Sequence, residues 1–423
     1  MKRLAILLAL LSLGWPAPAR ADLRAAAAKV DITPRNSQWL LGYQARQSDG
    51  VLDHIYHRVL ALDAGGTPFY LISTDVCLLS PSFHDAVMRE LQTRTGVDPA
   101  HVWWSVTHTH AAPELGPPDM YKVLLGRSDH EWDREYTKLV VDALIEAVKT
   151  AHDTLEPARL SVATTAANAN INRRARDVDG KTSLGLNPDG PVDRQVNLIR
   201  VQRPDGSPIA LVVNYAMHGT VMSGQNLKIS GDAPGVVAAY VEEQLGGTVL
   251  YINGAAGNIA PIYSVYADPS SGHLSQFRVL LGDRVISAVR AMPSGTDRVV
   301  IRHARQVVET PRRADLSWPD EMATYATNDR QRLRLPLRFV AINDNVIWSA
   351  PVEMFCEIAM GIRERSPFKQ TFYFGYTNGW FGYLPTARGF DEGGYEPRTS
   401  PFTSQVESDL TTAVNGFLRI FRK

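Results

Sequence analysis

Apolar runs and amphipathic stretches alternate along the chain, and their order predicts an α/β fold. The run PFYLISTDVCLL (residues 68–79) predicts a buried strand, and residues 81–96 predict an amphipathic helix that ends at Gly96. HVWWSVTH (residues 101–108) predicts the next strand. A strand, a helix and a second strand in this order form a βαβ unit with parallel strands, and ligands bind such sheets at the carboxyl ends of the strands.

The rest of the pattern extends this layout without dividing it into separate domains. We find no internal repeat, no low-complexity tract and no linker between domains. The chain therefore predicts one large α/β domain, residues 22–423, with a mixed β-sheet core flanked by helices. The other predicted elements are a helix at 131–150, a hairpin of 196–202 and 209–215, a strand at 248–253, a polar irregular segment at about 310–335, a hairpin of 337–342 and 346–351, and a closing helix at 408–421.

The first 21 residues have the three parts of a secretory signal. Lys2 and Arg3 form the positive start, residues 4–13 the apolar middle, and residues 19–21 an A-x-A cleavage site. The apolar part is too short to span a bilayer, so a retained membrane anchor is the less favoured interpretation. We expect the mature protein to begin at Asp22, to contain no transmembrane segment, and to be periplasmic or secreted.

Composition and charge exclude some classes of partner. Lys and Arg together number 44, as do Asp and Glu, so the formal net charge is zero. No basic stripe is present, which argues against nucleic acid as a partner. The two cysteines, Cys77 and Cys356, both lie in apolar surroundings, so buried free thiols are favoured over a disulfide between them.

Residues suited to bind a metal ion follow four apolar, strand-like runs. WWSVTHTH ends in His108 and His110, which would share one face of a strand because side chains i and i+2 point the same way. LVVNYAMHGT contains His218, Glu353 follows VIWSAP and opens a helix, and Tyr383 stands in the loop NGWFGYLPT. Nitrogen and oxygen ligands suit zinc, and catalytic zinc sites keep one position open for water.

Each of these residues also has a structural interpretation. The histidines could be satisfied polar residues at strand ends, Glu353 could favour a helix N-terminus, and Tyr383 could be a core tyrosine. The arginines of NINRRAR could form a solvated basic face, and the glycines of NGAAGN could serve only a turn. Asp232 in SGDAPG is a weaker candidate for orienting a ligand histidine or activating water.

The order of the motifs resembles the catalytic domain of the neutral/alkaline, non-lysosomal ceramidases, which are zinc amidases. The resemblance covers nearly the whole chain after the signal segment. It is carried by KVDITP, LLGY, THTH, NINRRA, VNYAMHGT, SGDAPG, NGAAGNIAP, APVEMF and GYLPT with GGYE. It implies that Zn²⁺ is bound by His108, His218, Glu353 and Tyr383.

The resemblance also implies roles for three further residues. His110 would polarise the scissile carbonyl, Arg173 would lie in the substrate pocket, and Tyr395 would be a second active-site tyrosine. With a zinc-activated water as nucleophile, His110 and Tyr395 are suited to donate hydrogen bonds to the oxyanion, and His110 to pass a proton to the leaving amine. The implied reaction is hydrolysis of a small-molecule or lipid N-acyl substrate, such as ceramide to a sphingoid base and a fatty acid, with at most transient contact with a membrane surface.

The sequence departs from the family pattern in three places. The family's loop carries an Asp and a catalytic Ser where this chain has Asn258 and Ala260, so water is the expected nucleophile. Glu114 would place an acidic side chain near the mouth of the site, and the C-terminal β-sandwich domain of full-length ceramidases is missing from this sequence. These departures leave open an amidase for another small or sugar-like N-acyl substrate, or a non-catalytic periplasmic binding protein of the same fold.

Overall fold

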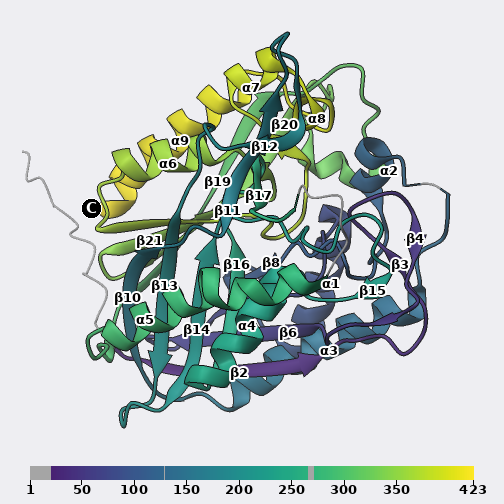
Figure 1. Cartoon of the computed structure of the whole chain (residues 1–423). Coiled ribbons are helices and arrows are strands. Elements are labelled where there is room, and N and C mark those ends of the chain that lie inside the picture. Colours follow the sequence, from purple (N-terminus) through teal and green to yellow (C-terminus); the bar gives the residue numbers. More distant parts are fainter. Residues whose placement is uncertain (1–20, 128, 265–270) are drawn as a thin grey trace, which may run out of the picture.

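The computed structural model describes residues 21–423 except 128 and 265–270 (Figure 1). All but the last residue of the predicted signal segment lies outside the described residues, so cleavage after Ala21 stays a prediction. Across the described ranges, no helix combines the length and the apolar character needed to cross a bilayer.

Three sheets form the centre of the molecule. Their strands are β2 (Arg24–Asp31), β6 (Tyr56–Asp63), β7 (Phe69–Thr74), β8 (Val102–Val106), β9 (Glu156–Pro157), β10 (Arg159–Ala166), β13 (Gln195–Gln202), β14 (Pro208–Tyr215), β16 (Thr248–Asn253), β19 (Ile301–Pro311), β20 (Arg332–Ile342), β21 (Asn345–Ser349) and β23 (Gln370–Phe374). The first sheet has the order β8-β7-β6-β2-β9, the second β10-β13-β14-β16 and the third β19-β20-β21-β23. Their inner faces share one buried apolar cluster, which includes Leu60, Trp103, Val212, Leu250 and Phe372.

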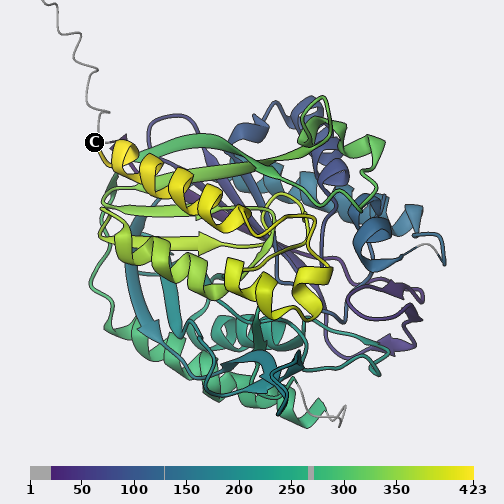
Figure 2. The same cartoon turned by 90° about the horizontal axis from the view of Figure 1, so that it is seen from above.

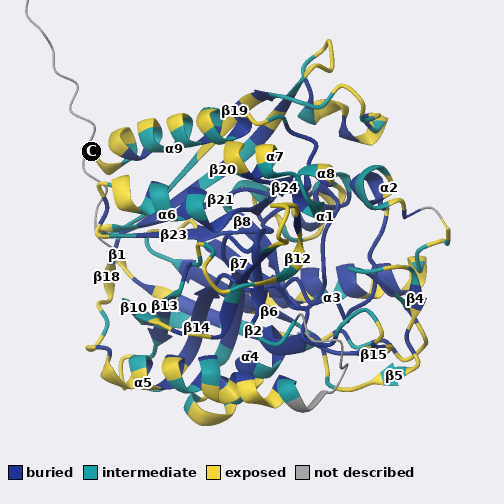
Figure 3. Ribbon diagram, turned by 45° about the horizontal axis from the view of Figure 1, so that its top comes forward, coloured by how far each residue is buried: buried dark blue, intermediate teal, exposed yellow. Residues whose placement is uncertain are grey.

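The α-helices surround these sheets, and five of them pack on the sheet faces. The helices are α1 (Pro81–Thr95), α2 (Asp119–Leu125), α3 (Arg134–Asp153), α4 (Asp232–Leu245), α5 (Asp283–Ala291), α6 (Cys356–Arg365), α7 (Ala387–Glu392), α8 (Tyr395–Arg398) and α9 (Val406–Arg422). α3 packs on the first sheet, α4 and α5 on the second, and α6 and α9 lie side by side over the third (Figure 2). β6, β7, β8, β14 and β16 are almost fully buried, while the outer faces of α4, α5 and α9 are exposed (Figure 3). The predicted fold class, a mixed β core flanked by helices, is confirmed.

Short strands complete the structure around the ends of the large sheets. They are β1 (Ala21–Asp22), β3 (Trp39–Leu40), β4 (Arg46–Gln47), β5 (Gly50–Val51), β11 (Asn170–Arg176), β12 (Thr182–Asn187), β15 (Lys228–Ile229), β17 (Ile259–Pro261), β18 (Arg298–Val299), β22 (Glu353–Met354) and β24 (Tyr383–Leu384). β11 pairs with β12 and β17, and β22 pairs in parallel with β24.

Most predicted elements are confirmed, although several boundaries are wrong. β7 and β8 are parallel, both predicted hairpins are antiparallel, and the predicted helices at 81–96, 131–150 and 408–421 are present as α1, α3 and α9. The strand predicted over 68–79 ends at Thr74, because the apolar residues after it enter a buried loop instead of the sheet. Part of the segment predicted as irregular belongs to β19 and β20, whose exposed positions give it a polar sequence.

Three parallel pairs bring the carboxyl ends of their strands toward one region. β8 pairs in parallel with β7, β14 with β16, and β21 with β23. His108 follows β8, His218 follows β14, and Glu353 follows β21 within a few residues. This arrangement places three of the predicted site residues at the strand ends where sheets of this kind bind ligands.

Candidate metal centre

Three predicted metal ligands from distant parts of the chain converge in the interior. His218 Nε2 lies 3.0 Å from Glu353 Oε2, and His108 Nε2 lies 3.4 Å from the same oxygen. All three side chains are at most 2% exposed. The ligand atoms of these residues lie within 4.8 Å of one another, and the group could hold a metal ion.

The outward nitrogens of the two histidines fix which ring atoms face the centre. His108 Nδ1 lies 2.8 Å from the carbonyl oxygen of Cys77, and His218 Nδ1 lies 2.9 Å from that of Ile259. A carbonyl only accepts hydrogen bonds, so each Nδ1 carries the proton and each Nε2 presents a lone pair to the centre. Hydrogen bonds of this kind orient metal-bound histidines in other proteins.

The protonation of the three groups leaves their lone pairs facing one another. Burial, and next the positive Arg173, lowers the pKa of His218 to about 3, so its ring is neutral. Two imidazole lone pairs and a carboxylate at 3.0–3.4 Å repel one another unless a cation lies between them.

The spacing of the donor atoms fits zinc. Ligand atoms bound tetrahedrally to zinc at about 2.0–2.1 Å lie about 3.3 Å apart. The two distances from Glu353 Oε2 to the histidine nitrogens, 3.0 and 3.4 Å, bracket this value. The residues present therefore fit a zinc ion.

Tyr383 completes the group with an oxygen atom. Its hydroxyl lies 3.4 Å from His218 Nε2 and accepts a hydrogen bond of 3.0 Å from Arg173 Nη2. Burial raises the pKa of Tyr383 well above its usual value, although the neighbouring guanidinium opposes that shift. The structure thus brings together all four side chains that the sequence singled out as metal ligands.

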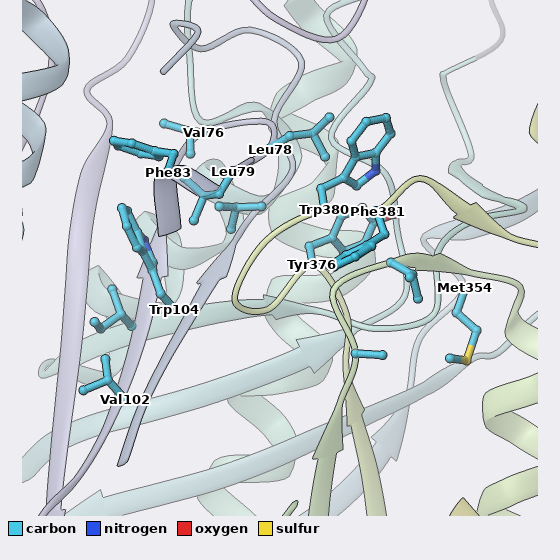
Figure 4. Close-up of a cluster of buried hydrophobic side chains, with 14 of the residues drawn as sticks. Val76, Leu78, Leu79, Phe83, Val102, Trp104, Met354, Tyr376, Trp380 and Phe381 are labelled. Atoms are coloured by element: carbon cyan, nitrogen blue, oxygen red, sulfur yellow. The ribbon is translucent and has the colours of Figure 1, made fainter. Parts of the chain in front are cut away.

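Glu353 is held from behind by two aromatic side chains. Trp380 Nε1 donates to Oε1 at 2.8 Å, and the Tyr376 hydroxyl donates to Oε2 at 3.3 Å. Both aromatic residues belong to a buried cluster with Phe381 and Trp104 (Figure 4). Glu353 lies in the short strand β22, and α6 begins three residues later at Cys356, so the prediction that Glu353 opens a helix is wrong.

His110 lies beside the candidate ligands, as predicted, but a different backbone path from the predicted strand places it there. Its Nε2 is 3.2 Å from His108 Nε2, yet the two histidines do not share a strand face. β8 ends at Val106 and His108 has a positive φ of 63°, so a turn of the backbone brings the two rings together. Burial, and next the two neighbouring histidines, lowers the pKa of His110 well below its usual value.

Arg173 belongs to a buried ion-pair network. Its Nε donates to Glu396 Oε1 at 3.1 Å, while Arg174 Nη1 donates to the other oxygen of the same carboxylate at 2.6 Å. Glu396 is 1% exposed, and neither arginine exceeds 7%. The alternative of a solvated basic face is therefore wrong for these two arginines. Arg176, whose side chain is 44% exposed, is the solvated member of the run.

A cavity of about 580 Å³ borders one face of β11 but contains none of the four candidate ligands. Another, of about 530 Å³, opens beside the candidate centre, and it is the one we assign to substrate. Its wall combines the predicted site residues with apolar and small ones: Gly42, Tyr43, Gln44, His110, Leu124, Leu125, Arg173, Leu184, Thr220, Ala260, Ser264, Tyr383, Tyr395 and Thr399. Burial raises the pKa of Tyr395 to about 12, so this hydroxyl keeps its proton at neutral pH. The structure thus places His110, Arg173 and Tyr395 on one wall.

Two residues of the motif NGAAGN, to which the sequence assigned at most a turn, hold the centre together. Asn253, at the end of β16, donates to the carbonyls of Thr107 and Met217, the residues immediately before the two histidine ligands. Gly257 lies so close to the backbone of Glu353 that an added Cβ would approach its carbonyl oxygen to 2.5 Å. The glycine therefore permits a close backbone approach, beyond serving a turn. The sequence feature that could have identified Asn253 is its position as a polar residue at the end of a buried strand.

The assignments of Asp232 and Glu114 are wrong. Asp232 accepts from the backbone N–H groups of Val221, Met222 and Ala233, so it ties the loop after His218 to the start of α4 instead of orienting a histidine ring. Glu114 is 4% exposed and its Oε2 accepts from Arg127 at 2.6 Å. It points into the protein and is absent from the cavity wall, because a neighbouring arginine compensates its charge.

Cys77 and Cys356 are buried free thiols, as predicted.

The fold and the donor set define an α/β domain with a buried candidate metal centre at its strand ends. A family model described as neutral/alkaline non-lysosomal ceramidase, N-terminal, matches residues 24–266, more than half of the chain. The chain belongs to this family, as the motifs predicted.

Neutral ceramidases of other organisms are similar in sequence to this chain, which supports the same family. Neutral ceramidase B of Dictyostelium discoideum is 28% identical over 255 residues, which cover 58% of this chain and 34% of that protein. Neutral ceramidase of Mycobacterium tuberculosis is 29% identical over 217 residues, covering 50% and 32%. The chain thus spans about a third of the length of these relatives.

Solved structures show the same fold over nearly the whole chain. The crystal structure of neutral ceramidase from Pseudomonas aeruginosa matches with a TM-score of 0.75 and 17% identity, covering 96% of this chain and 75% of that one. A ceramidase complexed with C2 matches with a TM-score of 0.76 and 16% identity, covering 95% and 75%. At this level of identity the likeness concerns the fold.

Proposed function

We propose that this protein is a zinc-dependent hydrolase that cleaves the amide bond of an N-acyl substrate, with ceramide as the first candidate. The observation that carries the proposal is the convergence of two imidazole lone pairs and one carboxylate, all buried, beside a cavity. His108, His218, Glu353 and Tyr383 would hold the ion. When bound, zinc supplies a Lewis acid and lowers the pKa of a water molecule to about 7.

The residues of the cavity wall fit the remaining needs of amide hydrolysis. Tyr395 keeps its proton and His110 is neutral, so each can donate a hydrogen bond to the oxygen on which negative charge develops. Arg173 stays charged and presents a guanidinium to a carboxylate or a polar headgroup. Ala260 lines the cavity without a hydroxyl, so this chain offers no serine nucleophile at that position and water takes that part.

The wall also supports an amphiphilic substrate. Leu124 and Leu125 of α2 and Leu184 of β12 add apolar surface to a wall that also carries charged and hydroxyl groups. An acyl chain gains free energy when it leaves water for such a surface, about 25 cal/mol per Å² buried. The signal segment predicted at residues 1–21 leads us to propose that the enzyme works in the periplasm or outside the cell.

We expect the purified protein to contain about one zinc ion per chain and to lose hydrolysis completely after treatment with a chelator, because the ion would activate the water nucleophile. The measurement is elemental analysis together with release of amine from a panel of ceramides, N-acyl amino compounds and N-acyl sugars. Re-addition of zinc should restore the activity. Zinc-loaded protein that cleaves no member of the panel would favour a binding protein of the same fold, and cleavage of the sugars alone would replace ceramide as the substrate.

A further inference from the structure

The short hairpin of residues 39–47, formed by β3 and β4, lies directly against His110. Gly42 stands at its tip with a φ of +117°, a conformation that residues with a side chain rarely adopt. An added Cβ at this position would lie 2.4 Å from His110 Cγ and 2.5 Å from Nδ1. No substitution at position 42 leaves the imidazole where it is, because the chain has no space between the two residues.

Two further residues of the same hairpin touch His110. The Tyr43 ring meets the imidazole edge to face, with the ring centres 4.9 Å apart. Arg46 Nη2 donates to the carbonyl oxygen of His110, and Arg46 Nε donates to the carbonyl of Asn226 at 3.0 Å. Gly42, Tyr43 and Gln44 also line the substrate cavity, so the hairpin is both a support for His110 and part of the wall.

A buried polar cluster fixes the hairpin to the segment that follows His110. Arg127 Nη2 donates to the carbonyl of Leu40 at 3.1 Å and to Glu114 Oε2 at 2.6 Å. The Glu114 N–H donates to the carbonyl of Trp39 at 2.8 Å, and the Trp39 ring stacks on His130. Glu114 therefore acts behind the cavity, where it holds the hairpin in place.

We infer that Gly42 is a positioning residue for catalysis: the 39–47 hairpin fixes the direction in which His110 presents its ring to the cavity. The inference rests on the proposed function, in which His110 donates to the oxyanion. His110 Nε2 lies 3.2 Å from His108 Nε2, but Nδ1 makes no hydrogen bond among the described residues, so on the Nδ1 side packing against the hairpin takes the place of a polar partner in orienting the ring. Misplacing a group of this kind by about 1 Å can cost 100-fold in rate.

The test is a double-mutant cycle on Gly42→Ala and His110→Ala, with Gly66→Ala as the matched control. Gly66 also has a positive φ, +92°, but nothing lies within 4 Å of its added Cβ, so it reports backbone strain alone. We expect Gly42→Ala to lower kcat about 100-fold with little change in KM. In the His110→Ala background the same change should alter kcat less than about threefold, and Gly66→Ala should leave kcat unchanged in both. All variants should retain one zinc per chain.

Equal losses in both backgrounds, or a Gly42→Ala enzyme with normal kcat, would overturn the inference. If Gly42→Ala does not fold, Arg46→Gln replaces it: the loss of the contact with the His110 carbonyl should lower kcat about tenfold, again only when His110 is present. Failure of the proposed function is recognised separately, as a wild type without turnover. The crystal structure of the zinc-loaded Gly42→Ala protein then decides, since we expect His110 to rotate while His108 and His218 stay, and an unmoved His110 contradicts us.

Discussion

Replacing Glu353 by glutamine is expected to weaken zinc binding by at least about 100-fold and to abolish hydrolysis while the chain stays folded. Loss of a group that merely orients a ligand costs 10–100-fold in metal affinity, and Glu353→Gln removes both a ligand oxygen and its negative charge. The fold should survive because the amide oxygen can still accept from Trp380 Nε1, and the amide N–H can donate to His218 Nε2.

The measurement is competition for zinc against a chelator of known affinity, with circular dichroism to confirm folding. Glu364→Gln is the matched control: it lies on α6, eleven residues along the chain, and its side chain is exposed. It should bind zinc like the wild type. A Glu353→Gln protein with unchanged zinc affinity would show that this carboxylate is not a ligand.

Glu396→Gln should lower the free energy of unfolding by about 3–5 kcal/mol, the cost of breaking a buried ion pair by removing one partner. Glu396 accepts from Arg173 and Arg174 with its two oxygens and is almost fully buried. The amide would turn an N–H group toward one of the two guanidinium groups, so a buried positive charge would lose its partner. Denaturant titration of the zinc-loaded protein measures the loss.

Glu392→Gln provides the comparison on the neighbouring helix. Its carboxylate contacts Arg176 and Arg388, whose side chains are 44% and 78% exposed, and it reaches the buried Arg174 only at 3.5 Å. Exposed pairs contribute little, so we expect a change below about 1 kcal/mol. Equal effects of the two substitutions would mean that the Glu396 network adds no more than a surface pair.

Local patterns predicted the elements well because apolar residues recur about every 2 residues in a half-buried strand and about every 3.6 residues in an amphipathic helix. The buried runs that became β8, β14 and β16 and the amphipathic stretch that became α3 are examples. The resemblance to the family then named the site residues, and their convergence follows from three parallel pairs that end in one region.

What the sequence missed depends on contacts between distant segments. The approach of His110 to His108 requires a positive φ that no period of two predicts. The sequence alone indicates that Glu114 is an exposed acidic residue, and only the structure shows that Arg127 lies beside it and allows it to be buried. Asn253 is one asparagine at the end of a strand, and its hydrogen bonds to the residues before both histidines appear only when β16 is placed beside the two loops.

The most direct test of a metal centre built by four distant segments is anomalous X-ray scattering at the zinc edge from a crystal of zinc-loaded protein. We predict one strong peak per chain at about 2 Å from His108 Nε2, His218 Nε2 and Glu353 Oε2, with the Tyr383 hydroxyl as a further ligand. A peak bound to other side chains, or none between these residues, would contradict the account.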